Sequence, residues 1–84
     1  MKLFVYSLKN ILFWGEAVSL TCETQTGQIT VLDNHEPLIT ALKEGLVKII
    51  DNDKKSSYIQ ILNGFLEIRT GNEVRCIISE KEKE

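Results

Sequence analysis

Hydrophobic and polar residues alternate with a period of two along several parts of the chain, most clearly at 73–79. Val74, Cys76 and Ile78 share one face of this segment. Arg75 lies on the opposite face. Alternation of this kind is typical of a β-strand with one face in a core and the other toward water or a partner.

Similar short segments recur along the chain, and no window has the apolar stripe of a helix of ten residues. Ile and Val, which favour strands, occur ten and five times, whereas Ala, the best helix former, occurs twice. The sequence therefore predicts an all-β fold, a flattened β-sandwich or barrel of about nine to ten short, mostly antiparallel strands. We expect strands near 2–8, 11–14, 16–23, 28–32, 38–42, 45–50, 57–62, 65–70 and 73–79.

Turn residues separate these segments. Positions 51–55 indicate a polar hairpin loop, and Asn63-Gly64 and Gly71-Asn72 indicate tight turns, because Asn and Gly tolerate positive φ. The second half is therefore predicted to be a meander of four strands, beginning with 45–50. The length of 84 residues suits one domain, which we place at 1–79, followed by a charged tail at 80–84.

The charge pattern excludes several classes of protein. The formal net charge is −2, and the densest basic run is the pair Lys54-Lys55, so we expect no nucleic-acid partner. Apolar runs reach only four residues, as at 3–6, whereas a membrane span needs about 20 and a signal peptide about 7–15. We therefore expect an intracellular protein without direct membrane insertion.

Residues able to support catalysis are sparse. His35 is the only histidine, and although acidic residues flank it, we expect its imidazole to hydrogen-bond within its loop or at an interface. Cys22 and Cys76 are too far apart in sequence for a Cys-x-x-Cys motif and are expected as small buried side chains. We therefore predict no catalytic residue, no metal site, no cofactor and no enzymatic activity.

Two binding functions remain open on the residues alone. A lipoyl- or biotinyl-type carrier domain is all-β and presents a lysine at a hairpin tip, which Lys54 or Lys55 would supply. An oligonucleotide-binding barrel would stack bases on aromatic side chains. The available aromatic residues are Phe4, Tyr6, Phe13, Trp14, Tyr58 and Phe65.

A spaced set of motifs covers most of the chain. It consists of Phe13-Trp14-Gly15-Glu16; Gly27 followed by Gln28-Ile29; Asn34-His35-Glu36-Pro37-Leu38 through Leu42; Gly45; and Asn63-Gly64-Phe65-Leu66-Glu67. In these motifs the sequence resembles the N-terminal β-sandwich domain of the epsilon subunit of F-type ATP synthase, over roughly 1–79.

The resemblance implies a rotor component rather than an enzyme. In that family the sandwich contacts the gamma subunit and rests on the polar loops of the membrane-embedded c-ring, and so couples ion translocation to ATP synthesis. By similarity we expect a peripheral location on the cytoplasmic face of the cell membrane. Members commonly continue as an inhibitory or ATP-binding helical hairpin, and a chain complete at Glu84 would lack those functions.

The resemblance also implies which residues meet each partner. Those expected to face the gamma subunit are Ser7, His35, Pro37 and Thr40. Those expected to face the c-ring are Gly27, Gln28 and Ile29. Some members carry an acidic residue where this chain has Gln28, so here a neutral hydrogen bond would replace a stronger charge-assisted one. Glu23 is a nearby carboxylate that would compensate for this change.

Overall fold

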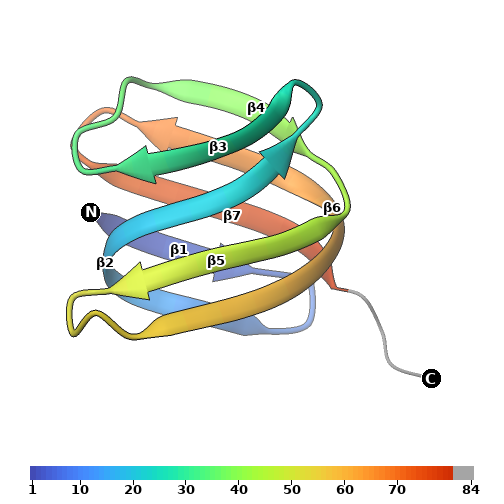
Figure 1. The fold of residues 1–84 in the computed structure, drawn as a ribbon, viewed down its shortest axis with the longest axis horizontal. Helices are drawn as coiled ribbons and strands as arrows, with labels where there is room; N and C mark the ends of the chain where they lie inside the picture. Colours follow the sequence, from blue (N-terminus) through green and yellow to red (C-terminus); the bar gives the residue numbers. More distant parts are fainter. Residues whose placement is uncertain (81–84) are drawn as a thin grey trace.

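The computed structural model describes residues 1–80, which form seven strands and no helix (Figure 1). The all-β prediction is therefore confirmed, and no segment of the described part is a helix able to cross a membrane. In chain order the strands are β1 (Lys2–Tyr6), β2 (Ile11–Thr24), β3 (Gly27–Leu32), β4 (Leu38–Leu42), β5 (Gly45–Asp51), β6 (Ser56–Arg69) and β7 (Glu73–Glu80).

The expected count of nine to ten strands is wrong because two pairs of expected strands are continuous. Segments 11–14 and 16–23 form the single strand β2, and 57–62 and 65–70 lie largely within β6. Each of these 14-residue strands bends from one layer of the sandwich into the other (Figure 1). The pairing register shifts between Ala17 and Ser19 in β2 and between Ile61 and Asn63 in β6. Such β-bulges bend a strand without ending it.

The turn expected at Asn63-Gly64 is therefore also wrong, and the second half is a meander of three strands rather than four. Gly64 is buried within β6 opposite Ile78 of β7. The other two expected turns are confirmed, because 51–55 connects β5 to β6 and Gly71-Asn72 connects β6 to β7. Asn72 adopts a positive φ of 62°, as the turn chemistry requires.

The strands form two layers that share β2 and β6. One layer, here called the β7 layer, pairs the first half of β2 with β1, then β7, the second half of β6 and β4. The other, the β5 layer, pairs β3 with the second half of β2, then β5 and the first half of β6. Only the β1–β7 pair is parallel among these ladders.

The core lies between the two layers and is built from the side chains that alternate inward along each strand. Its fully buried side chains include Leu3, Val5, Leu20, Cys22, Val31, Val47, Ile49, Ile61, Leu66, Val74 and Cys76. Cys22 and Cys76 are free thiols, as expected, and desolvation by burial raises the pKa of Cys22 to about 11 and that of Cys76 to about 12. Both thiols are therefore protonated and unreactive at neutral pH.

The loops gather at two ends of the sandwich (Figure 1). The Met1 end carries the N-terminus and the loops at 33–37, 52–55 and 70–72. The Glu80 end carries the connections at 7–10, 25–26 and 43–44 and the last residue of β7. Glu80, placed by the sequence in the charged tail, belongs to β7, and the rest of that expected tail, 81–84, lies outside the described residues.

Candidate partner-binding face

Outward-facing residues of the β7 layer form an unbroken apolar row. Cross-strand register places one residue from each of its five strands side by side, and none of them is charged. In order across the layer they are Ile11, Tyr6, Ile77, Phe65 and Ala41. Ile11 is 72% exposed and Phe65 60% exposed, so the row lies open on the surface.

A second row runs beside the first, toward the Met1 end, and joins aromatic and charged residues. Phe4 pairs with Trp14 on one side and Arg75 on the other, and Glu67 and Ile39 continue the row to β4. The Phe4 and Trp14 rings stack with centroids 6.2 Å apart. The Arg75 guanidinium lies 5.7 Å from the Phe4 ring centroid, within the range of a cation–π contact.

Ion pairs occupy the same face closer to the Met1 end. Glu73 Oε2 accepts a hydrogen bond from Arg75 Nε at 3.0 Å and lies 3.6 Å from Arg69 Nη1. Arg69 Nε also lies 3.1 Å from Glu67 Oε1. The hydrogen bond to Glu73 is the main cause of a raised pKa for Arg75. The charges thus form a network beside the apolar row, which itself contains none.

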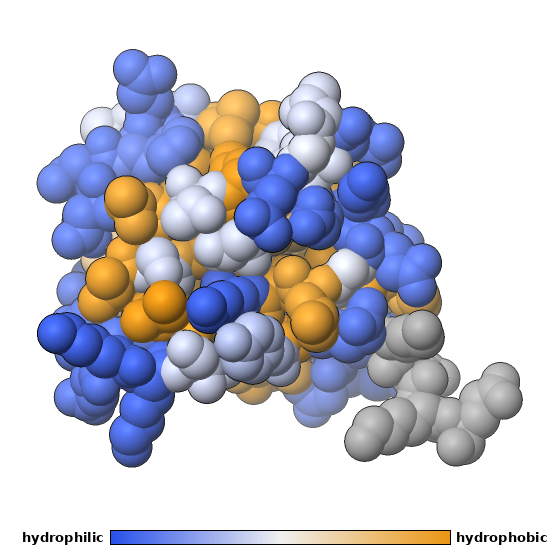
Figure 2. Space-filling view, in the orientation of Figure 1, coloured by the Kyte–Doolittle hydropathy of each residue, from blue (hydrophilic) through white to orange (hydrophobic). Residues whose placement is uncertain are grey.

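The opposite face, on the β5 layer, mixes polar and apolar side chains, and its exposed apolar residues include Leu32, Leu46 and Tyr58. Thr21 and Thr30 share a hydrogen bond of 3.1 Å across β2 and β3, and Lys48 lies 5.9 Å from the Tyr58 ring centroid. Figure 2, which views this side, shows apolar side chains in separate groups divided by polar ones. A continuous apolar row marks a protein interface more clearly than scattered apolar residues do. We therefore take the outer face of the β7 layer as the candidate partner-binding face.

None of the residues in these two rows was among the expected site residues, and this includes the exposed apolar residues Ile39, Phe65 and Ile77. Ile39 is 73% exposed and Ile77 43% exposed. The sequence did carry a signal for two of them. Phe65 and Ile77 occupy the polar phase of the alternation in strands that pair with each other. Apolar residues at the outward positions of two neighbouring strands indicate a face that another surface covers.

His35 and Pro37 lie in the loop before β4 at the Met1 end. Pro37 is exposed and His35 is half-buried. His35 Nδ1 lies 2.8 Å from the Glu36 carbonyl oxygen, which can only accept, so Nδ1 carries the proton. The expectation of a hydrogen bond within the loop is thus confirmed. Asn34, with a φ of 60°, donates its backbone N–H to Asn72 Oδ1 at 2.8 Å and ties this loop to the turn at 70–72.

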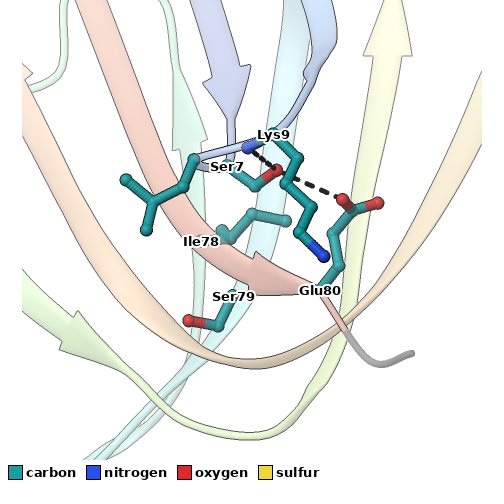
Figure 3. Close-up of a pocket in the computed structure, with 6 residues that line it drawn as sticks. Ser7, Lys9, Ile78, Ser79 and Glu80 are labelled. Atoms are coloured by element: carbon teal, nitrogen blue, oxygen red, sulfur yellow. Dashed lines mark hydrogen bonds between the residues drawn. The ribbon is translucent and has the colours of Figure 1, made fainter.

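Ser7 lies at the other end of the sandwich, beside Glu80 (Figure 3). Its hydroxyl donates to Glu80 Oε2 at 3.2 Å and accepts from the backbone N–H groups of Lys9 and Asn10 at 3.3 and 3.2 Å. A shallow hollow of about 190 Å³ adjoins these groups, lined in part by Ile78. The four residues expected to face gamma therefore do not form one cluster.

Thr40, the fourth of them, lies between these ends on β4. It pairs with Leu66, so its side chain is on the opposite side of the strand from Ile39 and Ala41. Thr40 is half-buried, and its hydroxyl lies 3.4 Å from the Ala41 carbonyl oxygen. Its orientation allows contact at the β4 edge rather than on the broad face.

The residues expected to face the c-ring begin β3 at the Glu80 end. Gly27 is exposed with a φ of 120°, and its carbonyl oxygen accepts a hydrogen bond of 2.8 Å from Thr24 Oγ1. Gln28 is exposed and donates from Nε2 to Glu23 Oε1 at 3.2 Å, which brings the proposed compensating carboxylate beside it. Ile29 is half-buried and packs against the core, so it supports the turn from below.

No group of three or more metal-ligating side chains occurs among residues 1–80. His35 faces the backbone oxygen of its own loop, and both thiols lie in the core. The side chains that the structure brings together on the surface are apolar rows and ion pairs, which suit binding to another macromolecule.

Sequence comparison gives a match across nearly the whole chain. Residues 1–83 match the profile of a family described as "ATP synthase, Delta/Epsilon chain, beta-sandwich domain". An ATP synthase epsilon chain from Dichelobacter nodosus is 30% identical over 69 residues, which cover 82% of this chain and 48% of that relative. The epsilon chain of Bordetella petrii is 32% identical over 71 residues, with 84% and 50% covered. The chain spans about half the length of these curated relatives.

Solved structures share the fold. A chain in the mitochondrial ATP synthase of Euglena gracilis, in a structure of OSCP, F1 and c-ring, superposes with a TM-score of 0.88 at 21% identity, covering 95% of this chain and 51% of that one. A chain in a Tetrahymena thermophila structure of the central stalk and c-ring gives a TM-score of 0.84 at 12% identity, with 95% and 63% covered. The matching family is neither a carrier-domain family nor an oligonucleotide-binding one.

Proposed function

The chain belongs to the family of ATP synthase delta and epsilon chains, of which it forms the β-sandwich domain, and from this premise we propose that it is a non-catalytic central-stalk subunit of a rotary ATP synthase. The family match over residues 1–83 carries the proposal. In this role the domain binds the gamma subunit and the c-ring and couples ion translocation to ATP synthesis. Its place is peripheral, at the cytoplasmic face of the membrane.

The gamma subunit is proposed to cover the β4 side of the β7 layer. Ile39, Ala41, Phe65 and Ile77 give this half of the face a continuous apolar surface, here called the β4-side patch. Pro37 leads into the same strand at one end, and Thr40 lies at its edge. Burying large apolar side chains supplies about 25 cal/mol per Å², which favours this patch as the main source of affinity.

Ser7 and His35 border this surface at its two ends. The Ser7 hydroxyl is held beside Glu80, and the His35 ring is held by its own loop, so both are fixed before binding. Fixed polar groups lose little conformational entropy on association. We assign them the polar rim of the gamma contact, which orients a complex that the β4-side patch stabilises.

The c-ring is proposed to meet the β2–β3 turn at the Glu80 end. Gly27 and Gln28 present their exposed edges there, while Ile29 anchors the start of β3 to the core. Gln28 orients the Glu23 carboxylate through a hydrogen bond of 3.2 Å. The pair thus offers the polar loops of the ring one neutral amide, which can donate and accept hydrogen bonds, and one negatively charged carboxylate.

A rigid domain is suited to transmit rotation between two partner subunits, and strands shared by both layers make this domain rigid. Because β2 and β6 each belong to both layers, backbone hydrogen bonds as well as the core connect the two faces. The gamma and c-ring contacts therefore lie on one unit, and displacement at one is passed to the other without a hinge.

Binding to a cognate gamma subunit tests the proposal. Gel filtration at micromolar concentration should give a co-eluting complex. His35→Ala, Pro37→Ala and Phe65→Ser should weaken it, whereas Lys54→Ala and Lys55→Ala, in the loop between β5 and β6, should leave it unchanged. Absence of a complex would overturn the function, and a stronger effect of the lysine variants would overturn the assigned face.

A further inference from the structure

The first part of β6 has an unpaired edge. Residues 56–61 pair with β5 on one side, whereas β7 pairs with β6 only from Ile61 onward and β4 only from Gly64. On its other side the stretch 56–60 therefore has no strand neighbour among residues 1–80, and β6 is the last strand of the β5 layer (Figure 1). No register shift interrupts its ladder with β5. This stretch is here called the β6 edge.

The register shows which backbone groups point toward this edge. The Asp51 N–H donates to the Lys55 carbonyl oxygen at 3.0 Å, so these two residues form a hydrogen-bonded pair of the β5–β6 hairpin. Bonded and non-bonded pairs alternate along an antiparallel ladder, and the pairs that Ser56, Tyr58 and Gln60 form with β5 are therefore non-bonded ones. The N–H and C=O groups of these three residues point away from β5 and recur every two residues, about 6.8 Å apart. They form the pattern of donors and acceptors that an added strand requires.

Side chains leave the β6 edge unprotected. Edge strands of native sheets usually carry charged residues, proline or β-bulges, which prevent another strand from pairing. None of residues 56–60 is charged and none is proline. Tyr58 is 59% exposed, and Ile59 is only half-buried although it packs against the core. An added strand would cover the open side of both residues.

The two ends of the β6 edge differ in charge. Lys54 and Lys55 precede it and are exposed, and neither forms an ion pair within residues 1–80. Their loop is held by the Asp51 carboxylate, which accepts hydrogen bonds of 2.9 Å from the N–H groups of Asp53 and Lys55. At the other end, the pairing of β6 with Glu80 of β7 closes the edge. The edge therefore has room for a segment of about five residues, and acidic groups on that segment are accommodated best next to the lysines.

We propose that the β6 edge binds an extended segment of a partner polypeptide as an added antiparallel strand. The segment exchanges backbone hydrogen bonds with Ser56, Tyr58 and Gln60 and places β-branched or aromatic side chains beside the Tyr58 ring. Because it runs antiparallel to β6, its acidic residues lie toward its C-terminal side, next to Lys55. The site uses none of the residues assigned to the gamma and c-ring contacts, so it goes beyond the proposed function.

The geometry of the edge disfavours a second copy of this chain as the occupant. In a symmetric antiparallel pair that uses the whole stretch 56–60, Lys55 of one copy falls opposite Ile61 of the other. That position is already occupied by Glu80 of β7. A short segment that turns away after about five residues avoids this collision.

A labelled peptide of about seven residues, Thr and Val followed by two Glu, is the probe. N-methyl groups on alternate residues block one of its edges and prevent self-association, so that only the other edge can pair. The matched control carries N-methyl groups on the intervening residues as well, which removes the donors of both edges and leaves every side chain unchanged. Anisotropy of the label should show saturable binding of the probe. The control should bind at least about 10-fold more weakly, because its backbone hydrogen bonds to the edge are lost.

Variants of the protein locate the site. Tyr58→Pro removes an N–H donor that faces the edge but keeps the β5 ladder, because proline is tolerated where the N–H of an edge strand points to solvent. It should weaken probe binding at least about 10-fold, and more than Tyr58→Ser, which loses the ring and keeps the donor. Lys55→Glu should weaken binding several-fold and should prefer a probe that ends in two Lys. Lys43→Glu, the same change of charge in an exposed loop at the Glu80 end, should bind like the parent. Circular dichroism confirms that each variant is folded.

Equal binding of the probe and the control would show that side chains rather than the backbone are recognised, and would overturn the proposal. Failure of the probe to bind, or equal binding by the parent and Lys55→Glu, would overturn it as well. A dimer in analytical ultracentrifugation that Tyr58→Pro converts to a monomer would assign the edge to a second copy instead. A gamma complex that forms in spite of such results would leave the proposed function standing, and probe binding without a gamma complex would leave this site standing.

Discussion

Gly64 lies directly opposite Ile78 in the β6–β7 pair, where the two backbones approach too closely for any side chain on Gly64. A Cβ at Gly64 would fall 2.5 Å from the Ile77 carbonyl oxygen and 3.1 Å from the Ile78 Cα. Both of these atoms belong to the β7 backbone, so neither can move away by rotation of a side chain. A glycine is thus required at position 64 because β7 leaves no room for a Cβ atom, and not because the backbone there has an unusual φ.

Gly64→Ala is therefore expected to lower the free energy of unfolding by about 1–3 kcal/mol, the usual range for overpacking in a core. Urea denaturation followed by circular dichroism measures it. Asn63→Ala, at the exposed neighbouring position, is the matched control and should change stability little. An equal loss in both variants would contradict the steric explanation.

The two core thiols predict a loss of stability at alkaline pH. Burial raises the pKa of Cys22 to about 11 and of Cys76 to about 12, so the folded chain keeps both protons where the unfolded chain has lost them. This stabilisation is complete below the unfolded pKa of about 8.5 and is lost as pH rises through the folded values. The slope is up to about 1.4 kcal/mol per pH unit for each thiol.

Unfolding in urea at several pH values between about 8 and 11 measures this slope. Cys76→Ala should be less stable than the parent at pH 8 because it leaves a cavity, yet its stability should fall less steeply with pH. A parallel decline in the two proteins would show that other groups are responsible.

Asp33 predicts a loss of stability at acidic pH. Its carboxylate accepts hydrogen bonds from the Met1 ammonium and the Asn72 amide, and these bonds lower the pKa of Asp33, with the ammonium as the larger cause. A lowered pKa stabilises the fold above the unfolded value of about 3.9, and this contribution disappears as pH falls through the folded value. Asp33→Asn should therefore lower the melting temperature at pH 7.

The difference from the parent should shrink at a pH of about 3, where the unfolded carboxyl is mostly protonated. Asp53→Asn removes the same charge from the 52–55 loop at the same end and serves as the control. Thermal unfolding of the three proteins at both pH values gives the comparison. A deficit for Asp33→Asn that does not depend on pH would contradict the role of the charged pair.

Gln28 can be exchanged for the acid that some relatives are expected to carry. In Gln28→Glu, two carboxylates would face each other where Gln28 now donates to Glu23 at 3.2 Å. Like charges directly across a strand pair destabilise, and we expect about 0.2–1 kcal/mol at pH 7. The loss should diminish in high salt, because screening weakens repulsion between exposed charges. Urea denaturation at low and high ionic strength tests both parts.

The strands were predictable because alternation reports which face of a segment is buried, and it did so even at Val74, Cys76 and Ile78 in the last strand. The errors came from turn residues. The pair Asn63-Gly64 indicates a position where the backbone departs from a regular strand. Whether the chain reverses its direction there or only bends depends on its pairing with β7, ten or more residues later. Such long-range pairing leaves no mark in the local sequence.

The candidate site was predictable only in part. The resemblance pointed to Ser7 and His35, but their positions at opposite ends of the sandwich follow from the pairing of β1 with β7 and of β4 with β6. Ile39 and Phe65 became recognisable as one surface only when the register placed them on adjacent strands. Residue types indicate what a face can bind, whereas topology determines which residues share that face.

The parallel pairing of β1 with β7 also governs when this domain can fold. The first strand must wait for the last one, because Leu3 and Val5 are covered in part by Val74 and Cys76. A chain still emerging from the ribosome therefore holds β1 with one side open until residue 73 and its successors are free. We expect folding to be completed only after β7 has emerged, at the slower rates typical of non-local β topologies.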